Sequence, residues 1–392
     1  MTASAAVGRV EPTVSVVMSV YSRVYVGQAI DSILAQTYRD FEFILVDDSA
    51  DQTTAALLDQ YAARDQRLVV HHNERNIGQT RSLNKGLALA RGRYIARQDD
   101  DDISLPERLE REVALLENQP EVGLVGTQMQ LINSAGDLLA QPARFPQGNS
   151  EIQEELWRGC CFCHGSVIIR RECLPGPDPY EESLKPAEDY DLWLRLAEVT
   201  QLANLEAPLY QFRTHASSQS SQKRPVQMHH SAVALERALR RRWGDRFPAR
   251  PAASTARYYL EAAVLAFGSD DRPLASASLA SALALEPRLL QADEPLLSIL
   301  SDYTFSRPVA AAVVLCEALF SDLMPHTRRL SQLKARFISR LHMKAVYRQL
   351  RAGRVARPRE HLLPSIRHDP SWLLNRGVLA ILIRSSLTRT GR

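Results

Sequence analysis

The chain has 392 residues, 45% hydrophobic and 24% charged, a composition typical of a globular protein and not of a disordered or fibrous one. Its net charge of +3 is unevenly spread: residues 325–392 carry 16 Lys/Arg and two acids, so the remainder carries −11. No run approaches the roughly 18 apolar residues of a membrane span, and residues 1–13 lack the apolar core of a secretory signal. The five cysteines form no disulfide framework, so we expect a cytoplasmic protein.

Strands and helices alternate through the first hundred residues. Apolar runs rich in β-branched residues predict strands, and the segments between them have apolar residues at helical spacing. This alternation predicts an α/β fold with a mostly parallel sheet and helices on both faces. The predicted strands are 14–20, 41–48, 67–73 and 93–98, and the predicted helices are 25–36, 53–65 and 80–92.

Polar side chains follow each of these strands at its carboxyl end. In parallel α/β sheets, ligands bind outside the carboxyl ends of the strands. The sequence therefore predicts that four polar clusters converge on one edge of the sheet. They are Ser19 with Tyr21, Asp47 with Asp48, His72 with Asn73, and the four acids Asp99 to Asp102.

Beyond residue 121 the pattern is mixed. We expect strands at 122–132 and 165–171, a helix at 188–199, and a last strand that begins near 207 and leads into a polar loop. From about residue 222 the chain is predicted to be helical. We therefore expect a catalytic domain over 1–221 and a helical accessory region over 222–392, basic from about 325. The run "CCFCH" (160–164) lacks the paired spacing of a structural zinc site and is predicted to be buried thiols on a strand.

The run "QDDDDISLPERLE" poses an electrostatic question, because adjacent carboxylates repel one another. A solvated acidic loop is the simplest interpretation, and the ligand spacing of an EF-hand is missing. The position between a strand and a helix favours a divalent cation, since hard oxygen ligands suit Mg²⁺ or Mn²⁺ bound together with substrate phosphates. Asp102 is a candidate N-cap for the following helix.

Together, four stretches strongly resemble the inverting GT-A-fold glycosyltransferases of family 2. They are "VSVVMSVYSRVYVGQAIDSILAQTYRDFEFILVDDSADQT", "NERNIGQTRSLNKGLALARGRYIARQDDDDISLPERL", "HGSVIIRR" and "EDYDLWLRL". They occur in the family's order and cover roughly residues 13–219. The resemblance implies a nucleotide-diphosphate sugar as donor, a divalent metal (Mn²⁺ or Mg²⁺) on its diphosphate, and one carboxylate acting as base.

The resemblance also assigns the donor-binding residues. Ser19 and Tyr21 match positions that line the nucleotide pocket, and Asp48 matches the acid that binds the nucleobase, usually uracil. Arg81 falls on a position near the nucleotide and the diphosphate, although an exposed helix cation is the alternative interpretation. The tetra-aspartate covers the family's DXD motif, which gives Asp99 a role toward the ribose or the metal.

The same resemblance implies the metal and acceptor residues. Asp101 is expected to bind the metal, with Asp99 and His215 as further candidate ligands; a solvated loop histidine is the alternative for His215. Asp189 matches the general base, and Glu188 and His164 match positions expected to bind the acceptor. Asp100 takes the middle position of the DXD motif, which is commonly a small residue in the family, so this chain departs from the pattern there.

These residues predict a metal-dependent inverting glycosyltransferase. Glycoside hydrolases also use paired carboxylates, but they need neither a nucleotide pocket nor a metal. The donor is expected to be UDP-linked and the acceptor to be a hydroxyl of a glycan or of a lipid-linked acceptor in surface polysaccharide synthesis. The alternatives are a nucleotidyltransferase, which would release pyrophosphate, and a nucleotide-sugar-binding protein without turnover.

Two interpretations of the basic C-terminal region remain open. The region could dock the enzyme on the anionic inner face of the cell membrane, because "WLLNRGVLAILIRSSL" combines apolar residues with Arg376 and Arg384. Alternatively, the apolar residues form the core of a helical domain and the arginines are solvated. Nucleic acid is not an expected partner, since no stacking aromatics accompany the basic run.

Overall fold

A computed structural model describes residues 11–139, 144–215, 223–289, 293–304, 308–323, 330–351 and 359–387. The chain forms two compact units. The first comprises residues 1–223 and 230–251, and the second comprises residues 224–229 and 252–392. Helix α8 (Arg224–Trp243) therefore contributes to both units, and the boundary predicted after residue 221 stays a prediction.

The first unit is built on one eight-stranded sheet with the order β3-β2-β1-β4-β7-β6-β8-β5. Strands β1 to β4 run parallel to one another, β6 is parallel to β8, and β7 and β5 are antiparallel to their neighbours. The predicted mostly parallel sheet is confirmed. The strands are β1 (Val14–Val20), β2 (Phe41–Asp47), β3 (Leu68–His72), β4 (Tyr94–Arg97), β5 (Ile103–Ser104), β6 (Val122–Ile132), β7 (Ile168–Arg170) and β8 (Gln201–Arg213).

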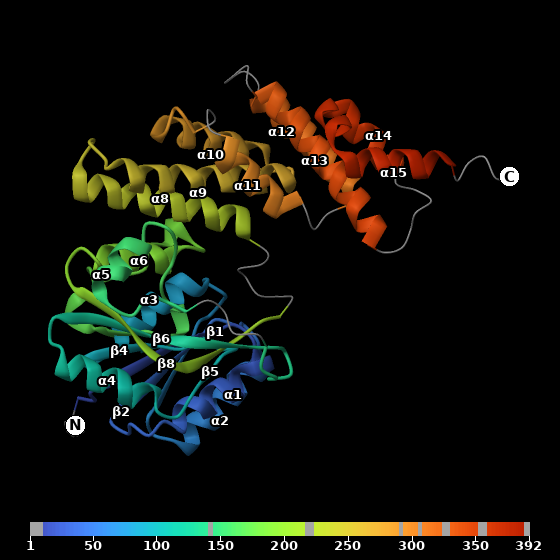
Figure 1. Cartoon of the computed structure of the whole chain (residues 1–392). Helices are drawn as coiled ribbons and strands as arrows, with labels where there is room; N and C mark the ends of the chain where they lie inside the picture. Colours follow the sequence, from blue (N-terminus) through green and yellow to red (C-terminus); the bar gives the residue numbers. More distant parts are fainter. Residues whose placement is uncertain are drawn as a thin grey trace, which may run out of the picture. The chain divides into compact units, whose positions relative to one another are not determined.

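Helices cover both faces of this sheet (Figure 1). Every residue of β1 is buried, because Val16 and Met18 face one helical layer and Val17 faces the other. A Cβ at Gly86 would lie 2.5 Å from Val17 Cγ1, so this glycine allows α3 to lie directly on the sheet. The helices α1 (Arg23–Leu34), α2 (Gln52–Arg64) and α4 (Arg108–Asn118) cover one face, and α3 (Gln79–Leu89), α5 (Asn149–Glu155) and α6 (Glu188–Leu196) lie over the other.

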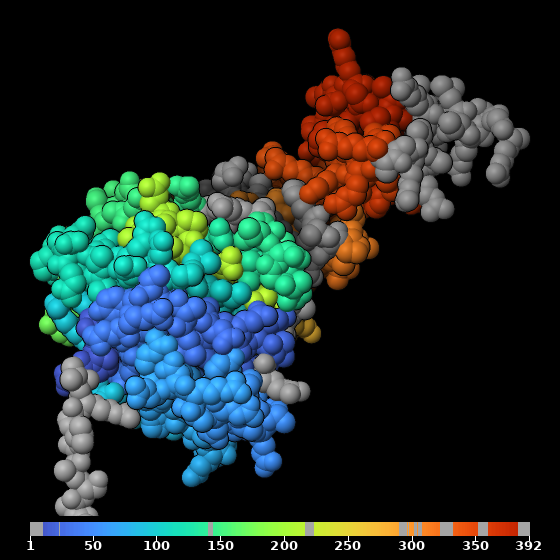
Figure 2. All heavy atoms as spheres, turned by 90° about the horizontal axis from the view of Figure 1, so that it is seen from below, coloured from blue at the N-terminus to red at the C-terminus, as the bar shows by residue number. Residues whose placement is uncertain are grey.

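The residues that come early in the chain, drawn in blue, gather on one side of the first unit (Figure 2). Two elements were not expected from the sequence, namely the short strand β5 and the helix α5. The predicted strand at 165–171 is shorter than expected, because His164–Ser166 forms a 3-10 turn before β7. The cysteines of "CCFCH" lie in the loop before this turn and not on a strand. Cys161 and Cys163 are buried as predicted, whereas Cys160 is exposed.

The second unit is helical, as predicted. Its C-terminal helices pack around a small apolar cluster that includes Met343, Val346, Leu362 and Val378. Within the described residues, no helix is long and apolar enough to cross a membrane. Its elements after α8 are α9 (Ala249–Gly268, shared with the first unit), α10 (Arg272–Leu285), α11 (Asp293–Thr304), α12 (Val309–Leu323), α13 (Leu330–Arg351), α14 (Arg359–His368), η5 (Pro370–Leu374) and α15 (Arg376–Leu387).

Candidate active site

A cleft of about 550 Å³ opens at the carboxyl ends of the parallel strands of the first unit. It gathers side chains from the ends of β1, β2 and β4, from the start of α3, and from the segment after β8. Six of the residues singled out from the sequence line it together, so the predicted convergence at one sheet edge is observed for them. Those six are Ser19, Tyr21, Asp48, Asp100, Asp101 and His215, and Ser22, Val24, Tyr25, Asn76, Gly78, Gln79, Lys185 and Lys223 complete the lining.

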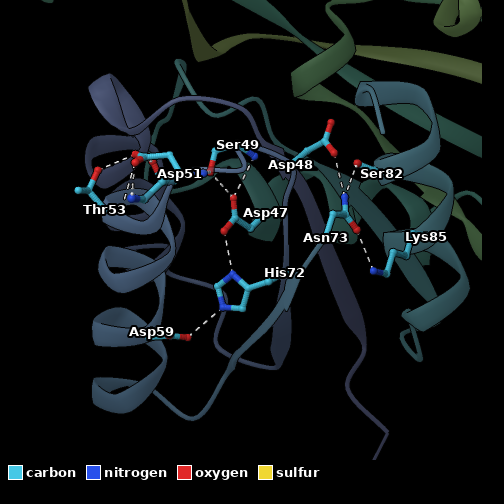
Figure 3. Close-up of polar contacts among 11 residues, drawn as sticks. Asp47, Asp48, Ser49, Asp51, Thr53, Asp59, His72, Asn73, Ser82 and Lys85 are labelled. Carbon is cyan, nitrogen blue, oxygen red and sulfur yellow. Dashed lines mark hydrogen bonds and ion pairs between the residues drawn. The ribbon is translucent and has the colours of Figure 1, made fainter. Parts of the chain in front are cut away.

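Asp48 is held at the end of β2 by the loop that leads into α3. Its Oδ1 accepts hydrogen bonds from Ile77 N (2.7 Å) and Asn73 Nδ2 (3.0 Å), and its Oδ2 accepts from Gly78 N (2.8 Å). Asn73 is itself held by Lys85, whose Nζ donates to Asn73 Oδ1 (2.8 Å) (Figure 3). The carboxylate of Asp48 is therefore fixed in orientation before any ligand arrives.

The neighbouring acid, Asp47, contacts residues of the surrounding fold and not the cleft. Figure 3 shows its side chain directed to His72 and Ser49, on the other side of the strand from Asp48. His72 Nδ1 lies 2.8 Å from Asp47 Oδ2, and His72 Nε2 lies 3.1 Å from Asp59 Oδ1 on α2. Hydrogen bonding to Asp47 raises the pKa of His72. Although the two acids are adjacent in sequence, only Asp48 lines the cleft.

Asp101 and His215 meet across 114 positions of sequence. His215 Nε2 lies 2.9 Å from Asp101 Oδ2. Arg213, at the end of β8, fixes this arrangement because its Nε donates to the carbonyl oxygen of Asp101 (2.7 Å) and its guanidinium lies 4.3 Å from the centre of the Tyr25 ring. The Tyr25 ring also contacts His215, with 5.7 Å between the ring centroids.

Asp99 lies deeper, in a setting that leaves it little freedom. Its Oδ1 accepts from Arg97 Nη2 (2.6 Å), and its backbone N–H donates to Tyr210 Oη (3.3 Å). A Cβ at Gly165 would lie 1.9 Å from Tyr210 Oη and 2.6 Å from Asp99 Oδ2, so only glycine fits beneath this carboxylate. Arg97 is buried, and no partner is found within the described residues for its Nε and Nη1 atoms.

The acidic pair begins helix α6. Burial, with the negative charge of Glu188, raises the pKa of Asp189 to about 7. Glu188 is 4% exposed, and its Oε1 accepts from Thr80 Oγ1 (3.2 Å) on the first turn of α3. Asp189 lies four residues after Lys185, which lines the cleft. Because its pKa is raised to about 7, its carboxyl can exchange a proton near neutral pH.

Five predicted site residues lie outside the cleft lining, namely Asp99, Glu188, Asp189, Arg81 and His164. Arg81 pairs with Glu182 (2.7 Å) in a separate hollow beside α3, where its side chain is half exposed. His164 Nε2 lies 2.9 Å from Tyr180 Oη, and burial lowers the pKa of His164 to about 3, so the imidazole is neutral. The donor-binding role of Arg81 and the acceptor-binding role of His164 stay predictions.

Asp102 has a role that differs from the predicted one. Helix α4 begins at Arg108 with Glu107 at its N-cap position, so Asp102 does not cap it. Instead, Asp102 is buried and its Oδ1 accepts from the backbone N–H of Arg213 (2.7 Å). This bond attaches the end of β8 to the acidic loop.

Sequence reasoning missed the cations that organise the acids. Arg97 and Arg213 each lie at the end of a strand that is otherwise largely buried. A charged residue at the end of a predicted apolar strand is the sequence signal that could have identified them. It also missed Lys185, whose Nζ would lie 3.3 Å from a Cβ built at Gly78. Lys185 thus places a cation over the N-terminus of α3, inside the cleft.

Comparisons with known proteins match this part of the chain. The family described as "Glycosyl transferase family 2" matches residues 15–174. An uncharacterized glycosyltransferase of Methanocaldococcus jannaschii is 35% identical over 188 residues, which span 47% of this chain and 64% of that protein. The O-antigen biosynthesis glycosyltransferase WbnJ of Escherichia coli is 35% identical over 243 residues, which span 60% of this chain and 92% of WbnJ.

A solved structure shares the fold. The crystal structure of S. aureus TarS residues 1–349 in complex with UDP-GlcNAc matches with a TM-score of 0.50 and 20% identity, covering 86% of this chain and 92% of that one. At this identity the likeness establishes the GT-A-like architecture and no more.

The contact beneath Asp99 gives a first prediction. We expect Gly165→Ala to displace Tyr210 and Asp99, destabilising the fold by about 1–3 kcal/mol through overpacking and lowering turnover by at least about tenfold. Thermal unfolding and steady-state kinetics measure the two effects. Gly148→Ala is the matched control, since a Cβ there meets nothing within 4 Å. Wild-type activity in Gly165→Ala would show that the position of Asp99 does not matter.

Proposed function

Because the chain belongs to glycosyl transferase family 2, we propose that it transfers a sugar from a nucleotide-diphosphate donor to a hydroxyl group, with inversion at the anomeric carbon. The observation that carries the proposal is one cleft in which Asp48, Asp101 and His215 converge, while Glu188 at the start of α6 accepts a hydrogen bond from Thr80 at the start of α3. The relation to an O-antigen enzyme supports a surface glycan, or its lipid-linked precursor, as the acceptor.

The hydrogen bonds of Asp48 support a uracil-containing donor. A carboxylate has about four lone-pair sites, and three on Asp48 are used by Asn73, Ile77 and Gly78. One acceptor site remains, which suits the single imide N–H of uracil. Tyr21, with a side chain that is 66% exposed, lies in the lining of the same cleft and offers a ring face to the base.

Asp101 and His215 are suited to hold a divalent cation. Their facing atoms are 2.9 Å apart, close to the roughly 3 Å that separates adjacent octahedral ligands with metal–ligand distances near 2.1 Å. Among the described residues, no group of three or more His, Cys, Asp or Glu is placed to hold a metal, so diphosphate oxygens would complete the shell. A bound Mg²⁺ or Mn²⁺ supplies a Lewis acid that offsets the charge of the departing nucleoside diphosphate.

Asp189 supplies the base in this proposal. Its carboxylate accepts the proton of the acceptor hydroxyl as that oxygen attacks the anomeric carbon from the face opposite the diphosphate. An α-linked donor then yields a β-linked product. Lys185 adds a positive charge beside the N-terminus of α3, where the backbone N–H groups also favour phosphate.

A screen of nucleotide sugars, followed by release of nucleoside diphosphate, tests the proposal. A glycosyltransferase releases UDP or a related diphosphate only when an acceptor or water takes the sugar. A nucleotidyltransferase would release pyrophosphate instead, and a binding protein without turnover would release neither while still binding the donor. The proposal fails if no nucleotide sugar is consumed with any glycan or lipid-linked acceptor.

The metal role gives a second prediction. Asp101→Ala is expected to abolish turnover and to weaken Mn²⁺ binding, because it removes the cleft carboxylate that faces His215. The measurements are turnover in EDTA with and without added Mn²⁺ or Mg²⁺, and Mn²⁺ binding by electron paramagnetic resonance. Full activity of the wild-type protein in EDTA would remove the metal from the mechanism.

The raised pKa of Asp189 gives a third prediction. A base must be deprotonated to act, so kcat/KM should fall about tenfold for each pH unit below about 7 and level off above it. Asp189→Asn keeps the shape of the side chain but cannot take the proton, so turnover should fall by roughly 10²-fold or more. Donor affinity should change little, since the base faces the acceptor. This assignment would be excluded if Asp189→Asn kept near-normal turnover. It would also be excluded if the fall of kcat/KM below pH 7 were the same in this variant as in the wild-type protein.

We further propose that the C-terminal helices dock on an anionic membrane, where a lipid-linked acceptor would be found. Part of this region is plainly structural, because Leu362 and Val378 are buried in its core. Other apolar side chains remain outside, with Leu374 87% exposed and Leu363 56% exposed. The cations of the region favour an anionic bilayer over a neutral one, each contributing about 1 kcal/mol near such a surface.

Sedimentation with liposomes tests this docking. Full-length protein should sediment with anionic but not neutral vesicles at low salt, and less at high salt. Leu374→Asp should reduce sedimentation, whereas the control Val199→Asp, which changes a 72% exposed side chain of the first unit, should not. Protein that stays in the supernatant with anionic vesicles at low salt would show that the region is only structural.

A further inference from the structure

Asp100 occupies the position that is commonly a small residue in the family, and its contacts differ from those of its neighbours. Its Oδ2 accepts hydrogen bonds from the backbone N–H groups of Tyr21 (2.7 Å) and Ser22 (3.2 Å). These two residues connect β1 to α1, and Ser22 is the N-cap of that helix. Asp100 therefore joins the loop after β4 to the loop after β1, two segments 79 positions apart in sequence.

The side chain of Tyr21 does not anchor the β1–α1 loop in the core, since it is 66% exposed. Among the described residues, the bonds from Tyr21 N and Ser22 N to Asp100 are the polar ties that fix the loop to the acidic segment. An alanine at this position, as in a more typical sequence, could not make them.

The two joined loops line the two parts of the cleft that are proposed to bind the nucleotide and the diphosphate of one donor. Ser19 and Tyr21 line the part of the cleft assigned to the nucleotide, and Asp101 lines the part assigned to the cation and the diphosphate. Because Asp100 is adjacent to Asp101 and bonded to Tyr21, a shift of either loop is transmitted to the other through one carboxylate. Two sites joined by a shared element of this kind bind their ligands with a coupling free energy that is reciprocal.

We propose that Asp100 is a positioning residue that couples nucleotide binding to metal binding by tying the β1–α1 loop to the acidic loop. The carboxylate is committed to backbone amides and is not a third protein ligand of the cation. The inference rests on the proposed function for the identity of the two ligands, and on the structure alone for the tie.

Asp100→Ala and Asp100→Asn test the coupling, with UDP and Mn²⁺ as probes. In the wild-type protein, saturating Mn²⁺ should tighten UDP binding, measured by calorimetry. Loss of the two hydrogen bonds in Asp100→Ala should weaken UDP binding in the presence of Mn²⁺ by about tenfold. The enhancement by Mn²⁺ should be smaller in this variant than in the wild-type protein, and the part that remains reflects direct contact between the cation and the diphosphate. Asp100→Asn, which keeps an acceptor oxygen, should restore most of the affinity and of the enhancement.

Asp51→Ala is the matched control. Asp51 accepts from the backbone N–H groups of Thr53 (3.2 Å) and Thr54 (3.1 Å) at the start of α2, so this variant also loses two hydrogen bonds from backbone amides to a carboxylate. Asp51 does not line the cleft. Both alanine variants should lose thermal stability, but Asp51→Ala should keep the wild-type affinity for UDP and its enhancement by Mn²⁺.

Two outcomes would overturn the inference. If Asp100→Ala binds Mn²⁺ alone more than about tenfold more weakly, measured by electron paramagnetic resonance, Asp100 is a ligand and not a positioning residue. If it binds UDP with wild-type affinity and enhancement, the tie has no role in binding. A wild-type protein that binds neither probe would refute the proposed function itself, which separates the two failures.

Discussion

The four consecutive carboxylates after β4 repel one another, and the cleft is organised around the groups that offset this repulsion. Two unit charges 4 Å apart repel by about 1 kcal/mol in water and by about 4 kcal/mol at the effective dielectric of a protein surface. Each carboxylate has therefore acquired a partner of its own. These partners are Arg97 for Asp99, the amides of Tyr21 and Ser22 for Asp100, His215 for Asp101, and the amide of Arg213 for Asp102.

The partners come from elements that are distant in sequence, so charge compensation also assembles the site. The bond from Arg213 N to Asp102 spans 111 positions and fixes the end of β8 against the acidic loop. Since His215 follows Arg213 by two residues, the same bond delivers the imidazole to Asp101. The antiparallel pairing of β5 with β8 adds a second tie at this point, with Ile103 opposite Gln211. Strand β5 can be as short as two residues because it continues the acidic loop, which the bond from Arg213 N to Asp102 already fixes.

The sequence supports the prediction of the architecture better than that of the contacts. The strands and helices up to residue 98 follow from apolar periodicity, because a fully buried strand such as β1 needs a continuous apolar run. The resemblance also identified Asp48, Asp101 and His215, which lie in one cleft. It gave no reason to expect Glu182 as the partner of Arg81, since that ion pair depends on how a loop about a hundred residues later passes α3. Helix α5 was missed because it has only seven residues and lies in a polar segment, which gives little apolar periodicity.

Asp48 and Asp189 show how environment separates the roles of two identical side chains. Asp48 lies among hydrogen-bond donors, three of which already fix its oxygens, so it is built to present a stationary acceptor. Asp189 lies beside Glu188, and burial with that neighbouring charge raises its pKa to about 7. In the proposed mechanism, a fixed acceptor suits the recognition of a ligand, whereas a group that takes a proton works best when its pKa is near the working pH. The two acids are thus differentiated before any substrate binds, Asp48 by its hydrogen-bond donors and Asp189 by burial beside another acid.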